Sequence, residues 1–328
     1  QLRVDVKDIT EEKRLVQDVV ESLLVQLKES LKDGNTIELR GFGTFEPRLR
    51  KGRVNAVLET NPMDHDKVAN LSKVDINSFL PYAFYDVAIN IKYFPKAEGR
   101  QAMAMALDRE NLVPGITDNP EGCVLNYGVY PSNIFQIACP DYVNDPLPNL
   151  LQYDVKEAKK LAKKGGITDQ NAILIYPDSM GDFGKKLAEG IAKQLNEIGL
   201  NVEVKRTGDQ VYKRMIYKDK SYDLALMYHE GFDNWYSTID TLYSTKSVEN
   251  VTGVSDKQLE SLFKTLAKQN LTEKRIVYIK DIYNRCCELT PSLAICTLRK
   301  DIYCRGIKDV AIATDNAFLS VEDWTFKE

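Results

Sequence analysis

The strand–helix–strand pattern of residues 173–205 restricts the fold of this chain more than any other feature. Residues 173–176 are apolar, an amphipathic segment of about residues 183–198 stops at Gly199, and a second short strand is predicted at 202–205. Two strands joined through a helix in this way lie parallel in one sheet, in a right-handed βαβ unit. The chain is therefore predicted to contain an α/β domain.

Further strand and helix patterns flank this unit on both sides. Strands are predicted at residues 81–90, 222–228, 293–297 and 302–303. Helices are predicted at residues 100–109, 153–161 and, as a pair, between 256 and 288. This order of elements indicates a mixed sheet flanked by helices.

The composition is that of an ordinary folded protein. The 328 residues, 43% of them hydrophobic, are enough for about two domains. The net charge of -4 excludes a surface built throughout for nucleic acid, but it allows a local basic patch. No apolar run is long enough for a transmembrane segment, and residues 1–20 lack the apolar stretch of a signal peptide.

No catalytic or metal-binding constellation is recognisable in the sequence. His229, Glu230 and Asp233 have a spacing that suits metal ligands on a helix, but they follow a predicted strand. The six cysteines form no C-x-x-C pair, and a structural role is expected for them; Cys123 and Cys139 bracket a loop that a disulfide would close in an oxidising compartment. We expect no enzymatic activity, no metal and no cofactor.

The N-terminal residues form a separate pattern. Residues 11–32 are amphipathic with helical spacing and stop at Asp33-Gly34, after which 36–40 and 41–45 indicate a β-hairpin. Residues 38–53 carry a basic stripe, which consists of Arg40, Arg48, Arg50, Lys51 and Arg53. Such a stripe is either a DNA-contacting surface or the solvated face of the hairpin.

Residues 37–45 (IELRGFGTF) and 48–53 (RLRKGR) resemble the signature of the HU/IHF family of bacterial DNA-binding proteins. In that family a dimer clamps DNA between two β-arms, and arginines grip the minor groove. The resemblance implies that the basic stripe contacts DNA. The segment is incomplete, however, because residues 54–60 lack the basic character of the arm and the family's last strand and helix do not follow.

A second and longer resemblance covers residues 75–328. Residues 100–109 (RQAMAMALDR), 154–161 (DVKEAKKL) and 222–226 (YDLAL) resemble motifs of the family 5 solute-binding proteins, which serve ABC importers of peptides and related solutes. The resemblance implies a periplasmic-binding-protein-like lobe, a peptide or related small solute as ligand, and an importer permease as partner. It also implies an extracytoplasmic location, in the periplasm or as a membrane-anchored lipoprotein.

The resemblance also indicates candidate ligand residues. An acidic residue after the YDLA strand receives the α-ammonium group of the peptide, and Asp233 is the best positional candidate, with Asp240 as the alternative. Tyr228, Trp235 and Tyr236 are candidates for contact with ligand side chains. Each has an ordinary structural alternative, since aspartate is common in turns and aromatic residues mostly pack in cores.

The domain organisation predicted from both resemblances is an HU-like segment at 1–53, a junction at 54–74 and a solute-binding lobe with hinge strands at 75–328. The leading hypothesis is solute binding for an ABC importer. The alternative is a cytoplasmic, ligand-responsive regulator that binds DNA through the HU-like segment, and a third is an accidental joint without combined function. The opposing lobe is expected to be largely absent from this chain, so weak ligand binding is expected.

Overall fold

The computed structural model describes parts of the first half of the chain and most of the second. The described residues are 37–39, 43–45, 55–58, 68, 70–71, 74–113, 116–117, 122–129, 151–230, 235–269, 272–310 and 324–326. Two compact units, Gln1–Arg53 and Val54–Glu328, make up the chain. The helix predicted at 11–32 and all residues of the basic stripe lie outside the described residues.

In the first unit, β1 (Ile37–Leu39) and β2 (Gly43–Phe45) form an antiparallel pair. Leu39 pairs with Gly43, as the two arms of a short hairpin require. The hairpin predicted from the sequence is confirmed.

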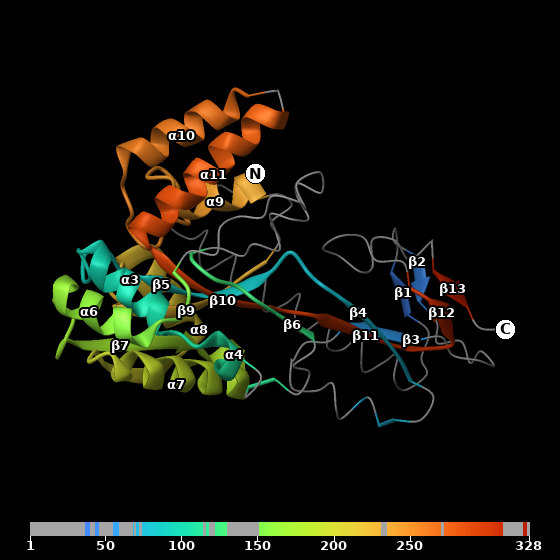
Figure 1. The fold of residues 1–328 in the computed structure, drawn as a ribbon. Coiled ribbons are helices and arrows are strands. Elements are labelled where there is room, and N and C mark those ends of the chain that lie inside the picture. Colours follow the sequence, from blue (N-terminus) through green and yellow to red (C-terminus); the bar gives the residue numbers. More distant parts are fainter. Residues whose placement is uncertain are drawn as a thin grey trace, which may run out of the picture. The chain divides into compact units, whose positions relative to one another are not determined.

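A mixed six-stranded sheet, counted over the described residues, forms the centre of the second unit (Figure 1). Its order is β6-β10-β5-β9-β7-β8, with β5 (Phe84–Ile89), β6 (Cys123–Leu125), β7 (Asn171–Pro177), β8 (Asn201–Thr207), β9 (Leu224–His229) and β10 (Ser292–Leu298). β7 is parallel to β8 and β9, and the other pairs are antiparallel. The predicted α/β fold with a mixed sheet is confirmed.

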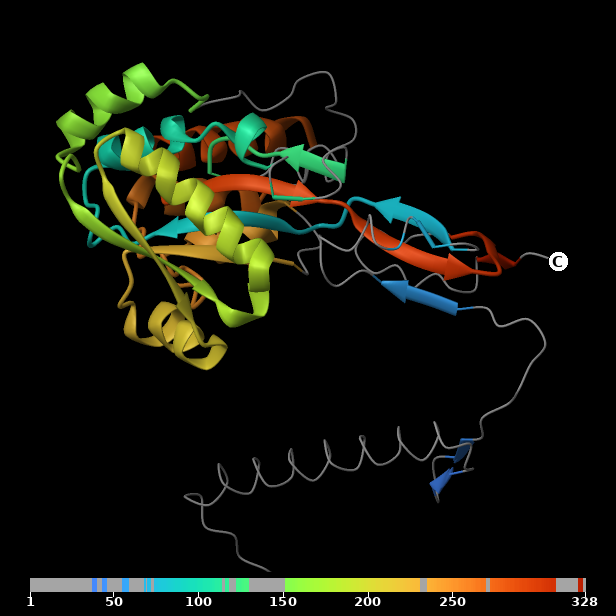
Figure 2. The same cartoon turned by 90° about the horizontal axis from the view of Figure 1, so that it is seen from below.

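Four helices pack on this sheet through one continuous core. They are α3 (Ala97–Ala106), α4 (Arg109–Leu112), α6 (Val155–Gly165) and α7 (Gly181–Glu197). Leu187, Ile191 and Leu195 follow helical spacing along α7 and are fully buried together with Leu174 of the sheet. Figure 2 shows α7 crossing the strands on one face.

Helix α6, predicted at residues 153–161, begins at Val155 and extends to Gly165. The Asp154 carboxylate accepts hydrogen bonds from the backbone N–H groups of Lys156 and Glu157 at 3.0 and 2.9 Å, and Gly166 ends the helix with a φ of +73°. A Cβ atom on Gly165 would lie 2.3 Å from the backbone nitrogen of Gly99 in α3. Glycine at this position therefore allows α3 and α6 to pack closely.

The two arginines of the RQAMAMALDR motif are structural. Arg100 donates hydrogen bonds to the carbonyls of Phe94, Leu289 and Thr290, and Arg109 donates to Ala294 O at 2.7 Å. Arg109 is only 1% exposed, and burial lowers its pKa to about 10. These two side chains therefore tie segments of the lobe together through backbone carbonyls.

A separate helical layer consists of α9 (Trp235–Tyr243), α10 (Lys257–Ala267) and α11 (Thr272–Leu289) (Figure 1). Its core contains Phe84 of β5 and residues of all three helices, including Ile239, Phe263 and Ile282. Asp256 precedes α10, accepts the N–H of Leu259 at 2.8 Å, and forms an ion pair with Arg285 of α11 at 2.7 Å.

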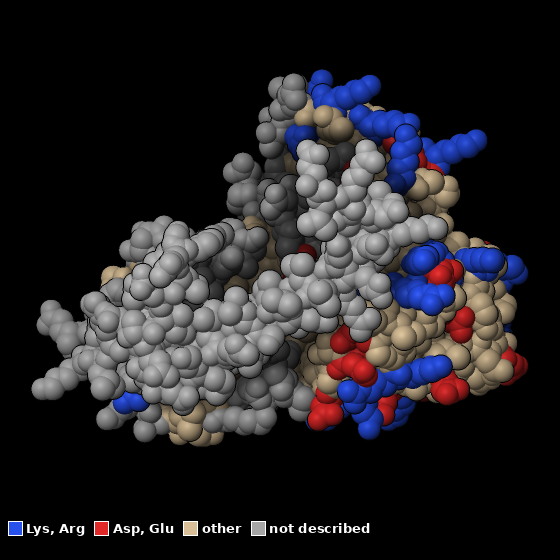
Figure 3. All heavy atoms as spheres, turned by 180° about the vertical axis from the view of Figure 1, so that it is seen from behind, with Lys and Arg blue, Asp and Glu red and all other residues tan. Residues whose placement is uncertain are grey.

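Charged side chains cover the outer faces of these helices. The lysines of α6 and α10 are exposed, with Lys160 paired to Glu157 at 2.8 Å. Figure 3 shows Lys and Arg gathered over part of the surface, with acidic residues interspersed elsewhere. The lysine run of α6 is thus the solvated face of its helix.

A three-stranded sheet, β3-β11-β4, continues from the six-stranded one. Its strands are β3 (Asn55–Leu58), β4 (Asp75–Phe79) and β11 (Lys300–Arg305). β4 leads into β5 through residues 80–83, and β10 leads into β11 through Arg299 alone, so two neighbouring chain segments connect the sheets. β3 lies within 54–74, where the sequence shows no periodicity.

Beyond this sheet, β12 (Ile307–Asp309) pairs with β13 (Thr325–Phe326). A small core there contains Phe79, Ile302 and Trp324. Within the described ranges, no helix has both the length and the apolar character that crossing a membrane requires.

Candidate ligand-binding cleft

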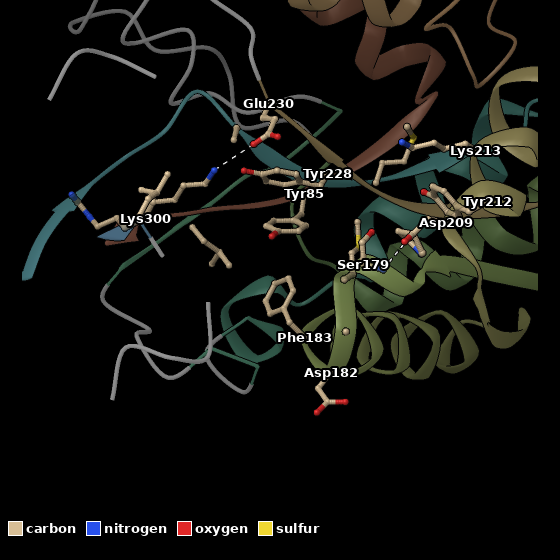
Figure 4. Close-up of a pocket in the computed structure, with 18 of the residues that line it drawn as sticks. Tyr85, Ser179, Asp182, Phe183, Asp209, Tyr212, Lys213, Tyr228, Glu230 and Lys300 are labelled. Atoms are coloured by element: carbon tan, nitrogen blue, oxygen red, sulfur yellow. Dashed lines mark hydrogen bonds and ion pairs between the residues drawn. The ribbon is translucent and has the colours of Figure 1, made fainter. Parts of the chain in front are cut away.

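A cleft of about 910 Å³ is lined by residues of both sheets of the second unit (Figure 4). Its walls come from the carboxyl ends of β7 and β9, the start of α7, residues 209–217, and the strands β3, β10 and β11. Ligands of α/β proteins commonly bind at the carboxyl ends of parallel strands. The volume suits a small molecule or a short peptide.

Three aromatic side chains line one side of the cleft: Tyr85 of β5, Tyr228 of β9 and Phe183 of α7. We call this surface the aromatic floor. The Tyr85 ring lies 4.8 Å from that of Tyr228 and 5.0 Å from that of Phe183, measured between centroids. Tyr85 and Tyr228 are directly paired in the antiparallel β5–β9 register. Burial raises the pKa of Tyr228, and the nearby Tyr85 and Glu230 raise it further, so this side chain stays a neutral phenol.

The turn between β7 and α7 forms a polar wall. The backbone N–H of Ser179 donates to Oδ1 of Asp209 at 2.9 Å, and Asp209 begins α8 (Asp209–Lys213). Hydrogen bonds from Ser179 lower the pKa of Asp209, so the carboxylate is ionised at neutral pH. Asp182, in the first turn of α7, adds a second acidic group to the lining.

Further residues after β8 also line the cleft, among them Tyr212 and Tyr217. The hydroxyl of Tyr212 donates to Leu226 O at 2.6 Å, which ties α8 to β9. Tyr217 belongs to the π-helical turn Arg214–Asp219, and burial together with Glu249 raises its pKa to about 12. Both tyrosines therefore remain neutral at physiological pH.

Opposite charges meet at the connection between the sheets. Nζ of Lys300, the first residue of β11, lies 3.3 Å from Oε2 of Glu230 and 5.6 Å from the centroid of the Tyr228 ring. Figure 4 shows these three side chains together at one end of the cleft.

His229 lies between Tyr228 and Glu230 in sequence but points away from the cleft, as strand alternation requires. Its Nε2 is 3.0 Å from Oδ1 of Asp86, and its ring stacks on Phe84 at 4.7 Å. Within the described part of the chain, no group of three or more His, Cys, Asp or Glu residues is arranged to hold a metal ion.

The candidate ligand residues predicted from sequence are only partly described. Tyr228 lines the cleft. Trp235 and Tyr236 are the first residues of α9, with side chains outside the described set, and Asp233 also lies outside it. Asp240 is half-buried on α9, away from the lining residues, and burial raises its pKa.

Sequence reasoning missed Tyr85, Phe183 and Lys300 as cleft residues. Tyr85 lies in a predicted strand and Phe183 at the start of a predicted helix, but their proximity depends on the β5–β9 register. The available signal was the position of aromatic residues at the ends of predicted strands and helices.

The cysteines are free thiols in the described residues. Cys123 is free and belongs to β6, while Cys139 lies outside the described residues. Cys286, Cys287 and Cys296 are buried. Burial raises the pKa of the Cys286 and Cys287 thiols, and a hydrogen bond with Cys123, followed by burial, raises that of Cys296. This arrangement agrees with the structural role expected for them.

A mixed sheet flanked by helices, with a cleft at its strand ends and two connecting strands beside it, defines a lobe of a periplasmic-binding-protein fold. The sequence profile of bacterial extracellular solute-binding proteins, family 5 (middle region), matches residues 47–250, and the chain belongs to this family.

Solved structures support the fold. The substrate-binding protein CtaP of an ABC transporter from Listeria monocytogenes superposes with a TM-score of 0.71 at 20% identity, over 84% of this chain and 56% of its own. The oligopeptide-binding protein AppA from Bacillus subtilis, solved with a nonapeptide, superposes with a TM-score of 0.66 at 16% identity, over 81% of this chain and 55% of its own. NikA from Staphylococcus aureus, solved with Ni(L-His)2, superposes with a TM-score of 0.68 at 14% identity, over 83% of this chain and 57% of its own. This chain spans little more than half of each.

The N-terminal segment matches a different family. The profile of bacterial DNA-binding proteins matches residues 5–63. Integration host factor subunit beta from Pectobacterium carotovorum is 40% identical over 55 residues, which are 17% of this chain and 54% of that protein. DNA-binding protein HU from Thermus thermophilus is 46% identical over 41 residues, 12% of this chain and 42% of its own length. The chain thus spans about half the length of these curated relatives.

Proposed function

We propose that the second unit binds a peptide or a related small solute in the cleft and presents it to the permease of an ABC importer on the extracytoplasmic side. The observation that carries this proposal is the cleft at the strand ends, with its aromatic floor and the ion pair of Lys300 and Glu230 at one end. This arrangement serves binding, and the chain is proposed to be a binding protein without enzymatic activity.

The chemistry of the walls fits an extended peptide. Tyr85, Phe183 and Tyr228 offer an apolar surface for ligand side chains, while Asp209 and Glu230 offer acceptors for ammonium and amide groups. Two structures with the same fold were solved with oligopeptides, a nonapeptide and the peptide STSA. Two other structures with the same fold were solved with nickel–histidine complexes, and the proposed ligand class therefore includes related small solutes.

The connection between the sheets supports a closing motion. Among the described elements, residues 80–83 and Arg299 join the six-stranded sheet to the three-stranded one, and Arg299 also lines the cleft. A few residues between rigid elements can absorb the backbone rotation of domain closure. Bending here changes the width of the cleft, which would couple ligand contact to closure.

Four residues are proposed to contact the ligand. Tyr228 contributes its ring to the aromatic floor. Asp233 is proposed to receive the ligand's α-ammonium group, and Trp235 and Tyr236, at the start of α9, are proposed to stack on its side chains.

Isothermal titration calorimetry with a tripeptide and a nonapeptide series tests the function. Weak, saturable binding is expected, because a ligand held by one lobe stays hydrated on its other side. Tyr228→Ala should weaken it, whereas Tyr153→Ala, at an exposed tyrosine outside the cleft lining, should not. The proposal fails if no peptide binds saturably, or if both variants bind like the parent.

A second candidate function, DNA contact by the first unit, rests on the match of residues 5–63 to bacterial DNA-binding proteins. Arg40, Arg48, Arg50, Lys51 and Arg53 are proposed to bind phosphates. The uncharged stretch at 54–58 replaces the basic arm of that family, so this contact is proposed to be weak and without bending.

A further inference from the structure

The ammonium group of Lys300 lies in an arrangement that resembles a bound ligand cation. A tyrosine face lies 5.6 Å from Nζ and a carboxylate oxygen 3.3 Å from it. An aromatic face combined with an acidic group is a general means of recognising ammonium groups. Lys300, Tyr228 and Glu230 all line the cleft and lie together at one end of it (Figure 4).

The Tyr228 ring is a fixed platform, whereas the ammonium over it is replaceable. Tyr228 is held by its cross-strand contact with Tyr85 at 4.8 Å. The Glu230 side chain is 62% exposed, and ion pairs with an exposed partner contribute little free energy. The long, flexible stem of Lys300 lets its ammonium group leave without backbone movement.

The contact also joins the two sheets. Glu230 directly follows β9 of the six-stranded sheet, and Lys300 begins β11 of the three-stranded sheet. A solute between the sheets therefore competes with a contact that is already present.

We propose that Tyr228 and Glu230 form a subsite for an ammonium group of the ligand and that Lys300 occupies this subsite in the ligand-free protein. The inference rests on the proposed function and narrows its ligand class to solutes that carry an ammonium group, such as cationic peptides. An internal competitor lowers the apparent affinity by the fraction of molecules in which it fills the site.

Calorimetric titration of the full chain with trilysine and with trilysine acetylated on both its α-amino group and its side chains, which carries no ammonium group, tests this assignment. Lys300→Gln should tighten trilysine binding by about 3- to 10-fold and leave the acetylated peptide unchanged, because the competing ammonium is removed. Glu230→Gln should weaken trilysine binding in both the parent and the Lys300→Gln background. Lys160→Gln, which removes a lysine from the exposed α6 pair with Glu157, is the matched control and should change neither affinity.

Two calorimetric outcomes overturn the inference while the proposed function stands. If Lys300→Gln weakens both peptides, Lys300 contacts the ligand directly. If it changes neither, no internal competition exists.

A second measurement does not depend on peptide binding. NMR of isotope-labelled tyrosine rings in Lys300→Gln should show a saturable shift of the Tyr228 resonance with butylammonium chloride, lost on adding Glu230→Gln. Absence of that shift contradicts the subsite. A shift without binding of either peptide contradicts the proposed function and leaves the subsite intact.

Discussion

Nε2 of His229 lies 3.0 Å from Oδ1 of Asp86 across the β5–β9 pair, and the two residues are 8% and 2% exposed. The contact lies in the same strands that carry Tyr85 and Tyr228 into the cleft, on the opposite face. This buried polar pair therefore holds β5 and β9 together, and the opposite face of the same two strands carries Tyr85 and Tyr228 of the aromatic floor.

His229→Leu should destabilise the protein strongly. The substitution leaves the Asp86 carboxylate buried without its imidazole partner, which costs about 3–5 kcal/mol. Urea denaturation followed by circular dichroism measures the loss. The double variant Asp86→Leu/His229→Leu should be more stable than His229→Leu alone, because no charge then remains buried. A double variant that is less stable than His229→Leu would show that the buried Asp86 carboxylate is not destabilising without its imidazole partner.

DNA binding by the first unit should depend strongly on salt. Neutralising phosphates releases counterions, so the logarithm of the affinity falls linearly with that of the salt concentration, with a slope of about -0.9 per phosphate contact. Replacing Arg48, Arg50 and Arg53 with alanine should reduce both affinity and slope for a DNA duplex in fluorescence anisotropy. The Lys156→Ala/Lys159→Ala/Lys163→Ala variant removes the same charge from the exposed face of α6 and is the control. An affinity unaffected by salt would contradict phosphate contact.

The sequence predicted elements whose stability is local. The β7–α7–β8 unit and α6 carry their own periodicity and stop signals, such as Gly166 and Gly199, and they were placed to within a few residues. The π-helical turn Arg214–Asp219 and helix α9 were missed. Ile216 in that turn is buried in a cluster with residues distant in sequence, among them Ala88 and Ile175, so its conformation depends on tertiary packing.

The candidate site shows the same limit. Tyr228 was found because it closely follows the YDLAL motif, but the aromatic floor requires that Tyr85 and Tyr228 meet across β5 and β9, more than a hundred residues apart. The contact between Lys300 and Glu230 likewise follows from the place where β10 crosses to β11. Neither relation is encoded in local spacing.

Arg109→Met should lower the free energy of unfolding by about 3–5 kcal/mol. Arg109 donates to the carbonyls of Ala104, Leu107 and Ala294 in a fully buried position, and the substitution leaves these acceptors without their cationic donor. Guanidinium denaturation provides the measurement. Arg214→Met is the matched control, because the Arg214 side chain is 70% exposed and its ion pair with Asp219 should contribute at most about 1 kcal/mol. Equal losses in the two variants would refute the structural role of Arg109.

The link between Asp256 and α11 should make stability depend on acid pH. Hydrogen bonds from Arg285 lower the pKa of Asp256 from its ordinary value of 3.8, so the stabilisation is present above that value and is lost as the pH falls through the lower pKa of the folded state. Asp256→Ala also removes the cap of α10 and should cost about 1–2 kcal/mol at pH 7. The difference from the parent protein in urea denaturation should shrink as the pH falls below 3.8 towards the folded-state pKa. Asp281→Ala, at an exposed position of α11, should show a much smaller loss. A penalty for Asp256→Ala that stays constant as the protein is acidified would show that the charge of Asp256 does not stabilise the contact between α10 and α11.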